Sequence, residues 1–166
     1  MSRAFVNEDS GTDALPERPV SPARNLVTRR GLALIEREIE VLREALATAT
    51  VAGDRDAIAR ASRDLRYWSA RRASAEPVDP PAEAERITLG MAVTIEDEQG
   101  RRRSYRLVGE DEAEPRAGRI GWSAPVARLL LGRAVGDEVE LPFGTAEIVA
   151  IDPRPEPVDS PPAPQR

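Results

Sequence analysis

The chain has 166 residues and a net charge of −5 at pH 7, and it contains neither cysteine nor histidine. These two absences exclude disulfide scaffolds, thiolate or imidazole metal sites and histidine-based catalytic triads. Its length suits one ordinary domain or two small ones. Because no apolar run approaches the roughly 18 residues of a membrane span and the first residues lack a signal peptide's apolar core, we expect a cytoplasmic protein with no membrane insertion.

Proline and polar residues set three segments apart from the rest of the chain. Residues 1–27 carry too few apolar side chains to offset the entropy of ordering them, which predicts a disordered arm. Residues 76–86 form a proline-rich linker that no helix crosses intact. Residues 153–166 are predicted to be a second disordered tail. Two structured regions remain, at 28–75 and 87–152.

The first structured region contains no proline and is dominated by Ala, Leu, Glu and Arg, a helix-forming composition. On both sides of Gly53, apolar residues recur at alternating spacings of three and four, which is typical of a coiled-coil seam. If the chain reverses at Gly53, Ile39 faces Leu65 and Ile35 faces Trp68 in antiparallel register. The prediction is an antiparallel helical hairpin.

Capping residues fit this hairpin. Thr28 is the expected N-cap of the first helix and Asp54 that of the second. Gly53 is the expected residue that ends the first helix. The predicted hairpin is therefore a short rod, in which the first helix ends at Gly53 and the second is capped by Asp54.

The second structured region alternates short β-type runs with turn residues, which predicts an α+β domain. A helix is expected to begin at Ser123, whose hydroxyl would cap it, with Pro125 in its first turn, and to end at Gly132. The expected arrangement is a small antiparallel sheet packed on one helix. Its strands are predicted at 91–95, 105–107, 119–122, 135–141 and 146–151.

Residues 105–141 carry a resemblance to a known family. YRLVGEDEAEP, followed by GRIGWSAPVARLLLGRAVGDEVEL, is similar to the C-terminal domain of the GreA/GreB transcription elongation factors, which has an FKBP-like fold. The hairpin, with Thr28 and Gly31 at its start, resembles that family's N-terminal coiled coil. The resemblance implies a transcription elongation regulator, an accessory factor and not itself an enzyme. In the family the C-terminal domain docks on the rim of the RNA polymerase secondary channel, and the coiled coil enters the channel.

The same resemblance implies a docking surface at the Asp111 loop and at the helix start formed by Ser123, Ala124 and Pro125. The family commonly has serine directly before this proline, whereas Ala124 stands there, so the hydroxyl contact is lost or shifted by one residue. Helix initiation alone also accounts for Ser123 and Pro125.

The second helix of the hairpin is basic, and the family's basic patch implies that it contacts nascent RNA or the channel wall. Solvated faces and interhelical ion pairs are the structural alternative. The residues concerned are Arg60, Arg63, Arg66 and Arg71.

The hairpin tip reads Gly53-Asp54-Arg55-Asp56-Ala57. Gre cleavage factors carry a Gly-Asp pair with Glu three residues after the Asp, and these carboxylates hold a Mg²⁺ ion shared with the polymerase active site. Asp54 matches the first acid, but Ala57 stands where the second belongs, and Asp56 replaces it only if the turn differs. Helix capping alone explains both acids. We therefore expect weak or absent stimulation of RNA cleavage and no stably bound cofactor.

Two other functions remain open. One is a module that docks on polymerase or another protein without inserting its short hairpin. The other is prolyl isomerase activity, suggested by the FKBP-like fold, although fold alone does not carry function. Independent binding of duplex DNA is not expected, because a net charge of −5 opposes it at physiological salt.

Overall fold

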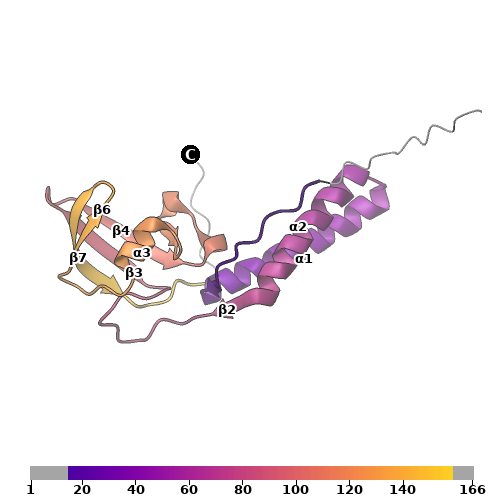
Figure 1. Ribbon diagram of the computed structural model, residues 1–166. Coiled ribbons are helices and arrows are strands. Elements are labelled where there is room, and N and C mark those ends of the chain that lie inside the picture. The colour runs from indigo at the N-terminus through magenta and orange to yellow at the C-terminus, as the bar shows by residue number, and fades with distance from the viewer. Residues whose placement is uncertain (1–14, 159–166) are drawn as a thin grey trace, which may run out of the picture.

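The computed structural model describes residues 15–158 (Figure 1). A helical hairpin projects from one side of a small sheet domain, and an extended N-terminal segment runs beside the hairpin. The parts of the predicted arm and tail at residues 1–14 and 159–166 lie outside the described residues. Neither hairpin helix, nor any other helix in the described chain, is long and apolar enough to cross a membrane.

The hairpin consists of α1 (Arg29–Ala52) and α2 (Arg55–Ser74). The Thr28 hydroxyl accepts a hydrogen bond from the backbone N–H of Gly31 at 3.0 Å. Gly53 ends α1 in the left-handed conformation, with φ of 68°. The Asp54 carboxylate caps α2 by accepting from the backbone N–H of Ala57 at 2.9 Å. The three capping predictions are confirmed.

A small apolar cluster from both helices holds the hairpin together. Ile35 and Ile39 of α1 are buried in it, and Leu65 and Trp68 of α2 pack against them. The predicted seam is therefore confirmed for these four residues. The cluster lies toward the base of the hairpin, because its remaining buried member, Val27, precedes α1.

Replacing Ile39 by alanine is expected to cost about 2–4 kcal/mol, because it removes buried methyl groups and leaves a cavity. Ile39 is 8% exposed. Urea unfolding followed by circular dichroism measures the loss. Val41→Ala is the control, since Val41 on the same helix is 54% exposed and should change stability by less than about 0.5 kcal/mol. Equal losses in the two variants would contradict a buried seam.

Two short strands clamp the base of the hairpin. β1 (Asn25–Val27) pairs in parallel with β2 (Ala75–Pro77). The Asn25 side-chain amide donates to the carbonyl oxygen of Arg71 at 2.7 Å. The predicted disordered arm is therefore wrong at its last three residues, because pairing with β2 and the burial of Asn25 and Val27 order them.

The sheet domain contains a five-stranded sheet in the order β5-β4-β3-β7-β6. Its strands are β3 (Ala92–Asp97), β4 (Arg102–Val108), β5 (Arg119–Gly121), β6 (Glu138–Leu141) and β7 (Gly144–Asp152). The predicted antiparallel sheet needs one correction, because β5 pairs with β4 in parallel. Two 3₁₀ turns, η1 (Glu110–Glu112) and η2 (Pro115–Ala117), carry the chain back to Arg106, so that β5 runs beside the last three residues of β4 in the same direction.

One short helix, α3 (Pro125–Leu130), covers the core of this sheet. Ala127 and Leu130 of α3 are fully buried against the sheet, together with Ile87, the first residue after the linker. The predicted α+β class is confirmed, with one helix on the sheet and a separate helical hairpin.

Candidate functional site

The acidic loop of the recognised motif lies against the base of the hairpin. There the Asp111 carboxylate accepts hydrogen bonds from the Tyr67 hydroxyl, at 2.6 Å, and from Nε of Arg71. The Arg71 side chain is 1% exposed and also lies 3.5 Å from the Glu110 carboxylate. We call this contact between η1 and the hairpin the junction, formed by Tyr67, Arg71, Glu110, Asp111 and Glu112 together with Thr28.

Glu112 makes the second half of the junction. It is 4% exposed, and its carboxylate accepts from the backbone N–H of Thr28 at 3.0 Å, the Thr28 hydroxyl at 2.6 Å and the backbone N–H of Gly109 at 3.0 Å. A methyl group on Gly31 would lie 2.0 Å from a Glu112 oxygen. Glycine at position 31 therefore lets this carboxylate reach the first turn of α1.

The junction also favours the protonated form of the Tyr67 hydroxyl. Burial, followed by the hydrogen bond to Asp111, raises the pKa of Tyr67 to about 12. Tyr67 therefore keeps its proton well into the alkaline range, where an ordinary tyrosine would lose it, and remains a donor to the Asp111 carboxylate.

These contacts bear on two sequence predictions, which concern partners and stay predictions. Asp111 was expected to dock on a partner and Arg71 to contact RNA or the channel wall. The Asp111 side chain is only 10% exposed, and the Arg71 side chain is buried against it. While the junction is closed, neither group is available to a partner, because each is used to hold the hairpin against the sheet domain.

The start of α3 presents a different surface. Ser123 does not cap the helix as predicted: its hydroxyl donates to the Glu110 carboxylate at 2.7 Å, and Ala124 occupies the N-cap position without a side-chain bond. Ser123 and Ala124 are partly buried, whereas Pro125 is exposed. One helical turn later, Leu129 is 39% exposed. Pro125 and Leu129 thus form an outward-facing apolar pair on α3.

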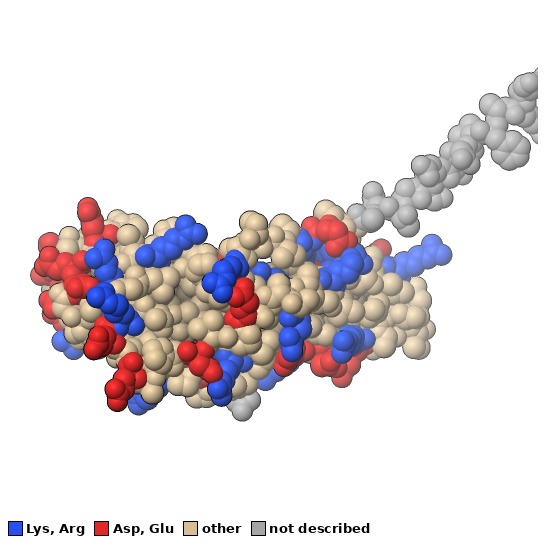
Figure 2. Space-filling view, turned by 60° about the horizontal axis from the view of Figure 1, so that its bottom comes forward, with Lys and Arg blue, Asp and Glu red and all other residues tan. Residues whose placement is uncertain are grey.

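The arginines of α2 differ in their surroundings. Arg60 is exposed. Arg63 forms an ion pair with Asp64 at 2.9 Å. Arg66 pairs with Glu17, which belongs to the N-terminal segment of residues 15–24. On the face shown in Figure 2, acidic and basic side chains alternate along the hairpin and form no continuous basic stripe.

The hairpin tip offers few ligands for a metal ion. One carboxylate oxygen of Asp54 caps α2 by accepting a hydrogen bond from the backbone N–H of Ala57. Position 57 is where the resemblance places the second acid. Asp54 and Asp56 are both exposed. Nowhere within residues 15–158 do three or more acidic side chains gather as a metal-binding group. The residues present therefore do not fit the two-carboxylate Mg²⁺ site that the resemblance implies.

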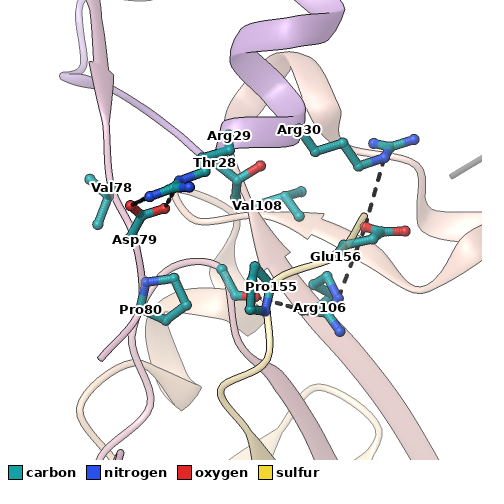
Figure 3. Close-up of a pocket in the computed structure, with 11 residues that line it drawn as sticks. Thr28, Arg29, Arg30, Val78, Asp79, Pro80, Arg106, Val108, Pro155 and Glu156 are labelled. Atoms are coloured by element: carbon teal, nitrogen blue, oxygen red, sulfur yellow. Dashed lines mark hydrogen bonds and ion pairs between the residues drawn. The ribbon is translucent and has the colours of Figure 1, made fainter. Parts of the chain in front are cut away.

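The C-terminal segment closes the other side of the junction (Figure 3). Glu156 forms ion pairs with Arg119 of β5, with Arg30 of α1 at 3.9 Å and with Arg106 of β4 at 4.0 Å. The hydrogen bond from Arg119 is the main cause that lowers the pKa of Glu156. The predicted disordered tail is therefore wrong at Pro155 and Glu156, since three arginines hold this segment.

A small cavity of about 10 Å³ lies between Glu156, the hairpin base and the linker. This is about the space that one water molecule needs. It is too small for an organic substrate, so the cavity marks close packing of the three segments.

Sequence comparisons agree with the motif. A family model described as "Transcription elongation factor, GreA/GreB, C-term" matches residues 82–153. A transcription elongation factor GreB from Yersinia pestis is 32% identical over 156 residues, which cover 81% of this chain and 91% of the relative. The chain belongs to the GreA/GreB family.

Other Gre-family relatives match over shorter or more distant stretches. A GreA from Anaeromyxobacter is 45% identical over 77 residues, which cover 45% of each chain. Among solved structures, the GreA factor homolog Gfh1 of Thermus thermophilus is 25% identical, with 78% of this chain and 99% of that chain covered and a TM-score of 0.37. A GreA/GreB factor from Nitrosomonas europaea is also 25% identical, with 76% and 98% covered and a TM-score of 0.39.

Proposed function

We propose that this Gre-family chain docks on bacterial RNA polymerase by its sheet domain, places its hairpin in the secondary channel, and modulates elongation with little or no stimulation of transcript cleavage. The relatives named above are transcription elongation factors. The observation that carries the cleavage part is the hairpin tip, where one acid caps a helix and an alanine occupies the second position.

The chemistry of the tip supports this proposal. Metal-assisted cleavage needs a second Mg²⁺ where the attacking water is activated, and such an ion is normally recruited by one or two well-placed carboxylates. Asp54 offers one carboxylate with an oxygen already engaged, and Arg55 places a positive charge beside it. The exposed Arg60 and Arg66 and the partly exposed Arg63 then remain as contacts to the channel or to nascent RNA.

The shape of the hairpin suits obstruction. α1 has 24 residues, which at about 1.5 Å per residue gives a rod of roughly 35 Å. A rod held in the channel alters nucleotide access and the path of a backtracked RNA 3′ end without chemistry of its own.

The protein should therefore bind a backtracked elongation complex without releasing short 3′ RNA fragments in Mg²⁺. Asp54→Ala should leave polymerase affinity nearly unchanged, because the tip contributes little to docking. A cleavage assay with an active Gre factor as positive control tests this. Strong fragment release that disappears in Asp54→Ala or Asp56→Ala would overturn the proposal and make the tip a working variant of the acidic pair.

Docking should depend on the exposed pair of α3. Leu129→Asp is expected to weaken binding to core polymerase about tenfold or more, because it puts a charge where an apolar contact forms. Val135→Asp is the matched control, since Val135 is 56% exposed and lies beyond α3. If both variants bind like the wild type, α3 is not the docking surface.

The remaining alternative is docking without insertion, which the shortness of the hairpin favours. A cross-linker placed at residue 53 separates the two functions. Reaction with the catalytic subunit near its active site supports insertion, whereas reaction only at the channel rim supports docking alone.

A further inference from the structure

The N-terminal arm, residues 15–24, lies along α2 (Figure 1). Its Glu17 carboxylate accepts hydrogen bonds from the Arg66 guanidinium. The guanidinium of Arg18 stacks over the Tyr67 ring, 3.9 Å from the ring centroid, and lies 3.6 Å from the Asp64 carboxylate. The arm therefore covers one face of the helix with a matched set of charges.

The outermost contact of the arm is weak. The side chains of Arg66 and Glu17 are 56% and 62% exposed, and ion pairs at such exposure contribute little and are screened by salt. Within the described chain, regular backbone pairing begins only at Asn25, where β1 starts. The arm can consequently leave α2 while β1 stays in place as its pivot.

The covered face is one that the proposed function uses. Arg66 is among the arginines expected to contact the channel, and Glu17 already supplies it with a carboxylate. A channel wall that binds this face must bring its own anionic groups to Arg66 and must displace Glu17. An arm of this kind competes with the partner for the same side chain.

We propose that the N-terminal arm is a removable intramolecular cover on α2, which acidic groups of RNA polymerase displace when the hairpin inserts. This inference rests on the proposed function, since it concerns regulation of the same surface. A cover that is closed in roughly 70–90% of molecules lowers the apparent affinity by about three- to tenfold.

Deleting residues 1–20 should therefore tighten binding to nucleic-acid-free core polymerase by about three- to tenfold. Glu17→Arg should act in the same direction. Two controls should leave the affinity unchanged: deletion of residues 1–14, which spares the contacts with α2, and Glu83→Arg, which makes the same charge change on the exposed linker.

Each result of this comparison is decisive. Equal binding by all variants would refute the cover and leave the proposed function intact. Weaker binding after the deletion would also refute the cover, because it would make the arm part of the interface with polymerase. A gain seen only when polymerase carries RNA would overturn the assignment to protein and point to RNA as the competitor. If neither the wild type nor any variant binds polymerase, the proposed function itself fails.

A tethered arm gives the converse test. The chain has no cysteine, so Arg18→Cys with Asp64→Cys creates a unique pair of thiols at two positions whose native side chains lie 3.6 Å apart, one on the arm and one on α2. Joining them with a cleavable thiol cross-linker should lower polymerase affinity about tenfold, and cleaving the linker should restore it. Unchanged binding by the tethered protein would refute a cover that has to open.

Discussion

Replacing Asp111 by alanine is expected to destabilise the protein by about 3–5 kcal/mol, because it leaves the Arg71 guanidinium buried without its closest carboxylate. Arg71 is 1% exposed in the junction. The alanine also removes the acceptor of the Tyr67 hydroxyl. Urea unfolding, monitored by circular dichroism for the hairpin and by fluorescence for the two tryptophans, measures the loss.

The matched control is the ion pair between Glu36 and Arg72, which joins α1 to α2 and is about half exposed. Glu36→Ala should cost less than about 1 kcal/mol, the usual range for surface pairs. If Asp111→Ala costs no more than Glu36→Ala, the junction does not hold the hairpin, and a docking role for Asp111 becomes the better explanation of the motif.

Replacing Gly31 by alanine should also be strongly destabilising, by roughly 2–6 kcal/mol, which combines overpacking with loss of buried hydrogen bonds. The direction of this stability change distinguishes Gly31 from an ordinary helix position. Glycine to alanine inside a helix normally stabilises by up to about 1 kcal/mol. Here the added methyl group would meet the carboxylate of Glu112 and push it away from Thr28 and Gly109.

A double-mutant cycle with Glu112→Ala separates the clash from helix propensity. Once the carboxylate is gone, Gly31→Ala should cost little or become stabilising. Ala45→Gly, on an exposed part of α1, measures the effect of helix propensity on stability without the clash. Additive losses in the cycle would show that Gly31 and Glu112 do not interact as the structure places them.

Local rules predicted the hairpin well. The seam spacing, a glycine at the turn and two capping side chains are all encoded by neighbouring residues, and the structure confirms them at Thr28, Gly53 and Asp54. The sheet was predicted except for the direction of β5. The direction of β5 depends on how η1 and η2 turn the chain back. The spacing of apolar residues does not encode that turn.

The site was predicted less well, because its contacts join residues far apart in the sequence. The motif drew attention to Asp111, but not to its partners Tyr67 and Arg71, which lie about 40 positions earlier. Composition likewise predicted that the segments around Glu17 and Glu156 are disordered. In each segment a carboxylate pairs with arginine, one exposed arginine at Glu17 and three at Glu156, and a residue count cannot show such pairing.

The separation of the two apolar clusters has a consequence for how the protein melts. One cluster lies in the sheet domain and the other in the hairpin, and polar groups of the junction lie between them. Most helical stability in proteins comes from tertiary packing, and the apolar cluster of the hairpin is small, so the hairpin is expected to take part of its stability from the sheet domain. The polar junction is therefore expected to carry much of the cooperativity between the two units, so loss of one of its buried charges should divide a single calorimetric transition into two.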